Sequence, residues 1–192
     1  MKKLMLLLPT TGYRNEDFLT AAQKLNAEII PVANYCHELA PLWGMAPLMA
    51  VPFDQPHRAL TQILNAVGDV VPDAVLAVDD LGLTLASLLS AHFGLLGNPP
   101  EAVQILRDKL LFRQFLSTHG FPAPAYVHVN HIAQLDKLNI AFPVVVKPRR
   151  LSGSRGVIRA NDQLELGVAV RSVEQIKKGA DGEGVKRGRI EE

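Results

Sequence analysis

The sequence lacks the features that mark several classes of protein. It has one cysteine, Cys36, so no internal disulfide can form, and this composition suits a reducing cytoplasm. The formal net charge is only +1, which gives no bulk electrostatic reason to expect binding to nucleic acid or to an anionic membrane. No apolar run approaches the roughly 18 residues that a membrane-spanning helix needs. We therefore predict a cytoplasmic protein with no nucleic-acid partner and no membrane partner.

The common nucleotide-binding fingerprints are also missing. The sequence contains no G-x-x-x-x-G-K-[ST] motif, so any ATP site is not a P-loop. Residues 10–12, which follow the first apolar run, read Thr-Thr-Gly and do not match the G-x-G-x-x-G pattern of a dinucleotide site. No cysteine or carboxylate joins His128 and His131 at the spacing of zinc ligands, so we expect no zinc site there.

Predicted strands and helices alternate in the first half of the chain. Residues 4–8 form a continuous apolar run, as expected of a strand that is covered on both faces of a parallel sheet. Residues 28–32 and 74–78 are the next clear strands, and the stretches between the strands carry helical apolar spacing. This alternation predicts right-handed βαβ units and therefore an α/β, Rossmann-like domain with a mostly parallel sheet over residues 1–98.

Two carboxylates, Asp79 and Asp80, follow the third of these strands. Open α/β sheets bind ligands beyond the carboxyl ends of their strands, so both residues are candidate ligand contacts. They are equally suited to capping the helix predicted over residues 83–93, and the sequence does not decide between the two roles.

Two prolines after residue 98 mark a boundary, because the second of them suits the first position of a helix. The following region, residues 99–178, contains predicted helices, short strands and a last helix that Asn161 or Asp162 can cap. Residues 179–192 contain four glycines and mixed charge without apolar periodicity. That composition predicts a disordered tail that joins no sheet.

A strand, a lysine and a loop of small residues follow one another in the stretch FPVVVKPRRLSGSRGVIR, residues 142–159. The β-branched residues 144–146 favour a strand, and Lys147 lies at its end. Pro148 cannot donate a ladder hydrogen bond, so the strand stops there or lies at a sheet edge. Residues 152–156, SGSRG, form a loop whose N–H groups and hydroxyls can surround an anion.

This stretch has two interpretations. In the first, the lysine and the loop clamp a polyphosphate, and nearby guanidinium groups add positive charge that matches phosphate oxygens. In the second, the loop is only a tight hairpin with solvated arginines. In either case we expect Arg149 and Arg150 to face outward.

The same stretch resembles the small-lobe strand, lysine and glycine-rich loop of ATP-grasp enzymes, above all of the biotin carboxylase-like branch. The upstream stretch, residues 98–126, reads NPPEAVQILRDKLLFRQFLSTHGFPAPAY and is similar to the entry helices of that family. The resemblance implies a pre-ATP-grasp domain over residues 1–98 and an incomplete α+β small lobe over residues 99–178. The nucleotide-binding residues that it implies are Lys109, Lys147, Ser152, Gly153, Ser154, Arg155 and Gly156.

ATP-grasp enzymes activate a carboxylate with ATP as an acylphosphate, which an amine or another nucleophile then attacks. The resemblance therefore implies ATP as the cofactor and an unidentified small carboxylate as the substrate. In the family, the acidic Mg²⁺ ligands come from a second, larger lobe, and they are not seen in this sequence. We thus expect the chain to bind ATP weakly, to be inactive alone, and to associate through the surface that the missing lobe would cover.

Other hypotheses remain open. The change of composition near Gly179 suggests a truncated product, or one part of a split enzyme whose other lobe is a separate chain. Alternatively, the chain is a Rossmann-like module that binds a small molecule, and the glycine loop is merely a hairpin.

Overall fold

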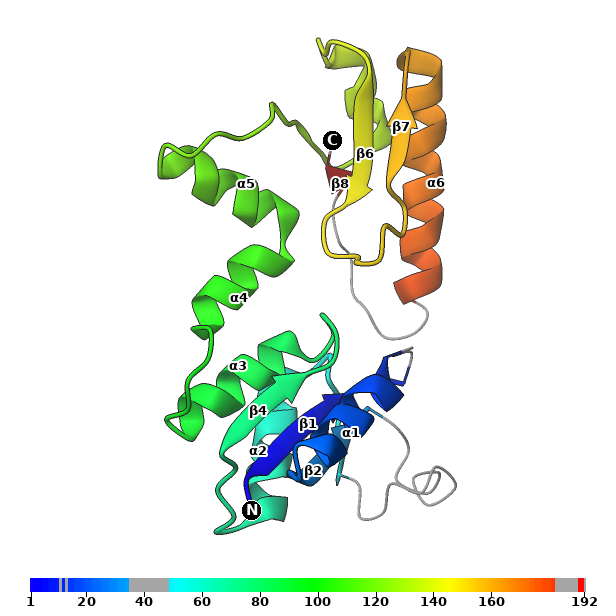
Figure 1. Cartoon of the computed structure of the whole chain (residues 1–192). Coiled ribbons are helices and arrows are strands. Elements are labelled where there is room, and N and C mark those ends of the chain that lie inside the picture. The colour runs from blue at the N-terminus through cyan, green and yellow to red at the C-terminus, as the bar shows by residue number, and fades with distance from the viewer. Residues whose placement is uncertain (11, 13, 35–48, 182–189, 192) are drawn as a thin grey trace. The chain divides into compact units, whose positions relative to one another are not determined.

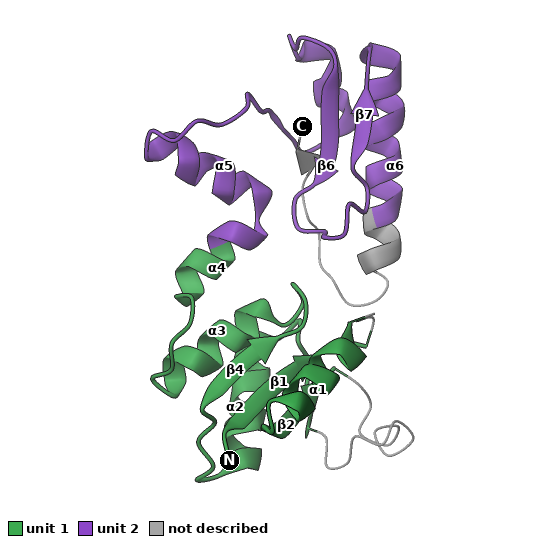
Figure 2. Ribbon diagram, in the orientation of Figure 1, with its two compact units in different colours: residues 1–104 green, residues 105–192 purple. Residues whose placement is uncertain are grey.

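The chain divides into two compact units, Met1–Gln104 and Ile105–Glu192, here called unit 1 and unit 2 (Figure 2). The computed structural model describes residues 1–10, 12, 14–34, 49–181 and 190–191, and beyond Ile176 it describes only the backbone. Cys36 therefore lies outside the described residues. The division falls inside helix α4 (Pro100–Arg107), slightly after the boundary that the prolines predict.

Unit 1 contains a four-stranded parallel sheet with strand order β3-β2-β1-β4 (Figure 1). Its strands are β1 (Lys3–Leu8), β2 (Glu28–Ala33), β3 (Met49–Ala50) and β4 (Ala74–Ala77). Its connecting helices are α1 (Asn15–Lys24), α2 (Pro56–Val67) and α3 (Leu83–His92). The alternation of strands and helices and the parallel pairing confirm the predicted α/β, Rossmann-like fold.

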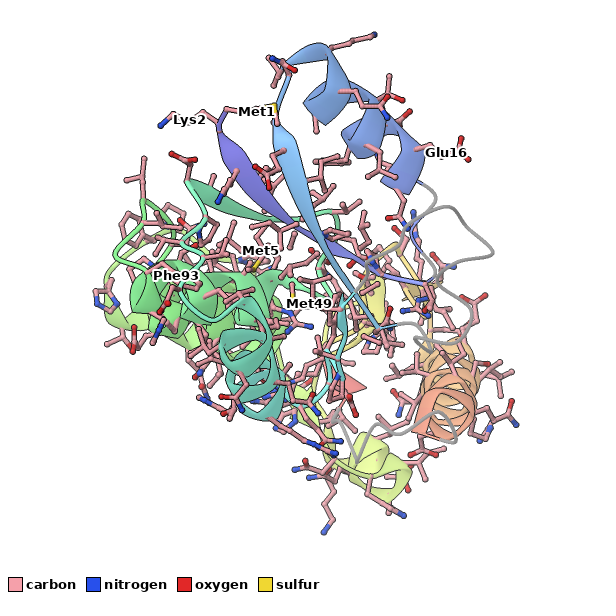
Figure 3. All side chains as sticks on the ribbon, turned by 90° about the horizontal axis from the view of Figure 1, so that it is seen from below. Met1, Lys2, Met5, Glu16, Met49 and Phe93 are labelled. Carbon is pink, nitrogen blue, oxygen red and sulfur yellow. The ribbon has the colours of Figure 1, made fainter. Side chains whose placement is uncertain are left out.

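Strand β1 is covered on both faces, which explains its unbroken apolar sequence. Met5 and Leu7 pack in one cluster with residues of α2 and α3, such as Ile63 and Leu89. The alternate residues of β1 pack on the other side, in a cluster that includes Phe18 of α1. Met5 lies among packed side chains in Figure 3, where Lys2 and Glu16 extend away from the core. No helix in the described part of the chain is long and apolar enough to cross a membrane.

Unit 2 contains an antiparallel sheet with strand order β5-β8-β6-β7. Its strands are β5 (His128–Val129), β6 (Val144–Pro148), β7 (Ile158–Ala160) and β8 (Ile190–Glu191). Its helical segments after α4 are α5 (Lys109–Thr118), the 3-10 helix η2 (Ile132–Lys137) and α6 (Gln163–Asp181). This is the α+β arrangement expected of the second region.

The core of unit 2 lies between one face of this sheet and helix α6. Val146 of β6 and Leu166 of α6 are fully buried in the same cluster, together with Leu135 of η2. Helix α6 begins where the sequence indicates, because the Glu165 amide donates to Oδ1 of Asp162 at 2.9 Å. Asp162 thus takes the capping role that the sequence left open between it and Asn161.

The predicted disordered tail over residues 179–192 is wrong in two places. Helix α6 continues to Asp181, and residues 190–191 form β8, which pairs with both β5 and β6. In the sheet register, Glu191 lies opposite His128 on one side and Lys147 on the other. Strands β5 and β6 have backbone N–H and C=O groups that a strand between them can pair with. Because this pairing is between residues distant in the sequence, the glycine-rich local sequence does not predict strand β8. Residues 182–189 and 192 lie outside the described part of the chain.

Candidate functional site

Lys147 lies at the end of β6 on the face of the sheet that does not meet α6. Successive strand residues point to opposite faces, and Val146, the residue before it, is fully buried in the core of unit 2. Val145 belongs to the same face as Lys147 and is 36% exposed, and its register partner Arg159 in β7 is exposed too. The Lys147 side chain is half-buried. An ammonium group on this face is available to a ligand that lies against the sheet.

Two successive tight turns form the loop that joins β6 to β7. The Arg155 amide donates to the Ser152 carbonyl at 3.3 Å, and the Val157 amide donates to the Ser154 carbonyl at 3.2 Å. Gly153 and Ser154 have left-handed φ angles of 63° and 57°, a conformation that costs glycine little and serine more. The side chains of residues 152–155 are exposed, so the loop presents hydroxyls and a guanidinium to solvent.

The end of the loop requires glycine for a second reason. Gly156 has a φ of 73°, and a Cβ atom there would lie 3.1 Å from Cγ and 3.2 Å from Cδ of Pro148. The loop therefore closes onto the last residue of β6. This contact holds the far end of the loop near Lys147, which precedes Pro148 in the strand.

The first part of the loop is tied to the start of α5. The Lys109 amide donates to the Arg149 carbonyl at 3.1 Å, and Nζ of Lys109 donates to the Leu151 carbonyl at 2.9 Å. The fold thus brings together Lys109 and the glycine loop, which are about forty positions apart in the sequence. In this structure the Lys109 ammonium donates a hydrogen bond to the backbone of the loop.

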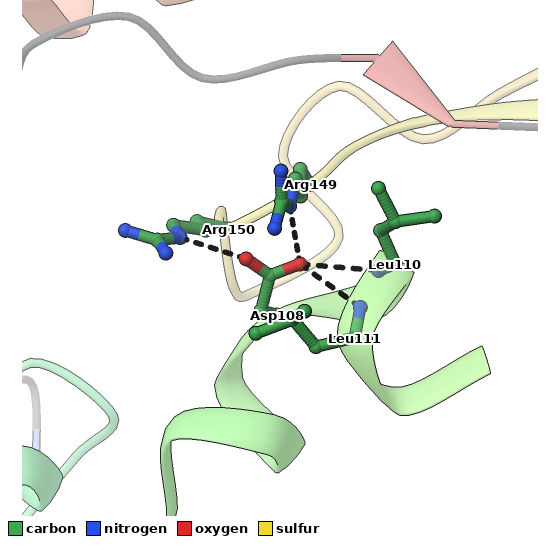
Figure 4. A network of polar contacts seen from close by, with 5 residues as sticks. All are labelled: Asp108, Leu110, Leu111, Arg149 and Arg150. Carbon is green, nitrogen blue, oxygen red and sulfur yellow. Dashed lines mark hydrogen bonds and ion pairs between the residues drawn. The ribbon is translucent and has the colours of Figure 1, made fainter. Parts of the chain in front are cut away.

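A buried carboxylate, Asp108, completes this connection (Figure 4). Its side chain is 1% exposed, and its Oδ1 accepts hydrogen bonds from the amides of Leu110 at 3.2 Å and Leu111 at 3.3 Å. Oδ1 also accepts from Nε of Arg149, and Oδ2 accepts from Nε of Arg150 at 3.1 Å. Asp108 therefore caps α5 and pairs with both arginines at the start of the loop.

The partners of Asp108 keep it ionised. Burial opposes ionisation, but the hydrogen bonds from Arg149, from the Leu111 amide and from Arg150 outweigh it, so the pKa of this carboxyl lies below its ordinary value of 3.8. The prediction that both arginines face outward is wrong for Arg149, whose side chain is 17% exposed. Arg150 is 68% exposed, yet Asp108 fixes its Nε. The sequence offered one signal that we missed, an aspartate directly before a helix, which is a preferred N-cap.

The carboxyl ends of the parallel strands in unit 1 are less suited to ligands. Oδ1 of Asp79 accepts from the Leu81 amide at 2.8 Å, so this carboxylate stabilises a local turn. The Thr10 amide donates to Oδ1 of Asn34 at 2.7 Å, while Thr11 lies outside the described residues. Among the residues that the structure describes, no three histidine, cysteine or acidic side chains are grouped so that they could hold a metal ion.

Unit 2 therefore contains the stronger candidate site. The site combines Lys147 near the end of β6 with four consecutive exposed residues of the loop, residues 152–155. The start of this loop is held by hydrogen bonds from Lys109 of α5. Loop amides, hydroxyls, ammonium and guanidinium groups are all hydrogen-bond donors to anionic oxygen atoms. The chemistry of this donor set fits a phosphate group.

Comparison with known sequences links the chain to ligases and synthases, although no family model matches it. It is 36% identical over 81 residues to the carbamoyl phosphate synthase large chain of Mycobacterium tuberculosis (strain CDC 1551 / Oshkosh), which is 41% of this chain and 7% of that protein. It is also 36% identical over 72 residues to the D-alanine–D-alanine ligase of Marinomonas sp. (strain MWYL1), covering 36% of this chain and 23% of the ligase. The chain thus spans less than a quarter of either relative.

Solved structures share the fold of the whole chain. The L-amino acid ligase of Bacillus licheniformis superposes with a TM-score of 0.71 at 20% identity, over 100% of this chain and 43% of that ligase. The N5-carboxyaminoimidazole synthetase of Staphylococcus aureus, crystallised with ADP, superposes with a TM-score of 0.64 at 17% identity, over 100% of this chain and 47% of that enzyme. The sequence similarity and the shared fold together support an ATP-grasp-type, ligase-like protein, and they are consistent with the N-terminal region of such enzymes.

Proposed function

We propose that unit 2 binds the phosphates of ATP between Lys147 and the glycine loop. The observation that carries this proposal is the position of Lys147 at the end of β6, beside a loop with left-handed turns that closes onto Pro148. A lysine supplies a compact point charge to a phosphate oxygen, and exposed loop amides supply directional hydrogen bonds. The ADP in the solved synthetase structure is consistent with this role.

Each residue of the loop has a separate role in the proposed phosphate site. Amides of Gly153, Ser154 and Gly156 and the hydroxyls of Ser152 and Ser154 bond the phosphate oxygens, and Arg155 adds charge at the loop tip. Lys109 holds the loop root through the Leu151 carbonyl and lies near enough to the loop to join the phosphate contacts when a nucleotide binds. Mg²⁺ would enter this site with the nucleotide and would neutralise part of its charge, and no acidic side chains among the described residues are grouped to hold it.

The reaction that we propose is the attack of a small carboxylate on the γ-phosphate of ATP, which forms an acylphosphate and releases ADP. Phosphoryl transfer of this kind depends mainly on positioning and on charge stabilisation, which a lysine and a loop of amides supply. The residues described in unit 2 support the binding step. The identity of the carboxylate depends on side chains that contact it, and no side chain that the structure describes in unit 2 selects one.

The proposal is tested by titrating Mg-ATP into the wild-type chain and into Lys147→Ala. Lys137→Ala is the matched control, because Lys137 is exposed on η2 in the same unit. We expect Lys147→Ala to weaken binding about tenfold or more, since a charged hydrogen bond contributes roughly 1.5–3 kcal/mol. Lys137→Ala should bind like wild type. Equal affinity of Lys147→Ala and wild type, with both proteins folded, would reject the site.

A further inference from the structure

The pairing of Asp108 with two arginines leaves one of them partly available. A guanidinium group has five N–H donors, and Asp108 engages only the Nε–H of Arg150. Within the described chain, no hydrogen bond to the terminal nitrogens of Arg150 is found, and the side chain is 68% exposed. Figure 4 shows these terminal nitrogens pointing away from Asp108. Arg149 differs, because its side chain is mostly buried beside the same carboxylate.

We propose that Arg150 is an additional phosphate-contacting residue and that buried Asp108 is the positioning residue that presents it. This inference rests on the proposed binding of ATP by unit 2. Asp108 accepts a hydrogen bond from Nε of Arg150. The two terminal nitrogens of Arg150 can therefore donate side by side to a pair of phosphate oxygens. An arginine that is already held in place loses less conformational freedom when it binds a ligand.

The position of Arg150 in the chain supports this role. It lies three residues after Lys147 and two before Ser152, so its Cα is at most about 11 Å from that of Lys147. Its side chain therefore starts between the lysine and the loop that are proposed to hold the nucleotide. The Lys109 bonds to Arg149 and Leu151 fix the backbone on both sides of it.

The charges of the cluster also suit a polyanion. One carboxylate faces two guanidinium groups, so Asp108, Arg149 and Arg150 together keep a net positive charge. The carboxylate is enclosed by two amides and two arginines, and its side chain is 1% exposed, so it offers little of its negative charge to a ligand. The exposed end of the cluster is the cationic end.

A substitution of Asp108 can separate its two roles. Asparagine is about as good an N-cap as aspartate, so Asp108→Asn keeps an oxygen that can accept from the Leu110 and Leu111 amides. It removes the negative charge that holds the arginines, because a neutral oxygen forms a weaker bond to a guanidinium than a carboxylate does. Asp108→Asn should therefore retain α5 while it frees Arg150 to move.

The experiment measures the affinity of the full chain for Mg-ATP and for inorganic tripolyphosphate. The proteins are wild type, Arg150→Ala, Arg150→Lys, Asp108→Asn and the double variant of Asp108→Asn with Arg150→Ala. We expect Arg150→Ala and Asp108→Asn each to weaken tripolyphosphate binding about threefold to tenfold, and Arg150→Lys to restore only part of the loss, because lysine lacks the fork. The double variant should bind no more weakly than Arg150→Ala, since Asp108 acts through Arg150.

Arg171→Ala is the matched control, because Arg171 is an exposed arginine on α6 of the same unit, and it should bind like wild type. Amide signals of Leu110 and Leu111 report whether α5 keeps its start in Asp108→Asn. Wild-type affinity of Arg150→Ala would overturn this inference and leave the proposed function intact. Losses that multiply in the double variant would overturn the positioning role of Asp108. Absence of any binding by wild type would reject the proposed function itself, and this inference with it.

Discussion

Both units are built on a four-stranded sheet, but they bury it differently. In unit 1 the residues of β1 alternate between a cluster with α2 and α3 and a cluster with α1, so both faces of the parallel sheet are covered. In unit 2 one face of the antiparallel sheet packs on α6, and described residues of the opposite face, such as Val145 and Arg159, are exposed. A sheet with an exposed face can hold a ligand against its strands, whereas a sheet covered on both faces offers only its edge.

The two units also differ in how their polar side chains are used. In unit 1, Asp79 bonds a nearby amide in its own turn, and Thr10 is held by Asn34 at the end of the adjacent strand. In unit 2, Asp108 and Lys109 reach a segment some forty residues away and fix the root of an exposed loop. Long-range polar contacts of this kind position donors that a ligand can use. The following predictions test this contrast between the units.

The largest effects should come from the two cores. Leu7 in unit 1 and Leu166 in unit 2 are both fully buried, so Leu7→Ala and Leu166→Ala should each cost about 2–5 kcal/mol of unfolding free energy. Because the two residues belong to separate hydrophobic clusters, each loss should be confined to its own unit. Residue-resolved amide hydrogen exchange of the two variants measures this. Equal loss of protection in both units from either substitution would mean that the chain unfolds as one cooperative body.

A smaller effect should distinguish two glycines of the loop in unit 2. Gly153 and Gly156 both have left-handed φ angles, so alanine at either position should cost about 1–2 kcal/mol in backbone strain. A Cβ at residue 153 meets no atom within 4 Å, whereas a Cβ at residue 156 crowds Pro148. Gly156→Ala should therefore cost about 1 kcal/mol more than Gly153→Ala. Urea unfolding curves compare them, and equal costs would show that the loop does not close onto β6.

The smallest effect is a difference in acid sensitivity. The Asp108 pKa is lowered on folding, so its contribution to stability is complete above pH 3.8 and is lost as the pH falls through its folded-state pKa. In unit 1 the hydrogen bond from Lys2 and the bond from the Lys3 amide lower the pKa of Asp73, which acts in the same direction at an exposed ion pair. High salt should remove most of the Asp73 effect and little of the Asp108 effect, because buried pairs are screened less.

Unfolding free energies of wild type, Asp108→Asn and Asp73→Asn between pH 2 and pH 6, at low and high salt, test this difference. Asp108→Asn should lose the acid dependence of unit 2 at both salt concentrations. Asp73→Asn should alter unit 1 only at low salt. An acid dependence of unit 2 that salt abolishes would contradict the buried position of Asp108.

Local sequence patterns predicted much of both units. The apolar run of residues 4–8, the β-branched run of residues 144–146 and the cap at Asp162 are properties of neighbouring residues, and each corresponds to a feature of the fold. The helix predicted over residues 83–93 is α3, and Gly94, which follows its C-cap residue Phe93, has a φ of 64°. Such features depend on periodicity and on backbone preference, which a single sequence displays.

The remaining features depend on contacts between distant residues. Strand β8 pairs with strands some 40 and 60 positions earlier, and its own glycine-rich surroundings carry no strand pattern. The inward position of Arg149 depends on Asp108, which neither arginine has near it in the sequence. The position of Lys147 at the strand end was predictable from the sequence. The hydrogen bonds from Lys109 to the backbone of the loop that follows Lys147 were not. These three features depend on contacts between residues that are distant in the sequence, and local composition does not predict such contacts.

The most direct test of the central claim locates ATP on the chain. The paramagnetic complex Mn-ATP, added in small amounts to the isotope-labelled full chain, broadens the amide signals of residues near the metal-bound phosphates, and Mn²⁺ without nucleotide is the control. We predict that the first signals to broaden belong to residues 147–156 and Lys109. Broadening centred on the carboxyl ends of the parallel strands, at residues 9–15 and 79–82, would place the nucleotide in unit 1 and contradict this account.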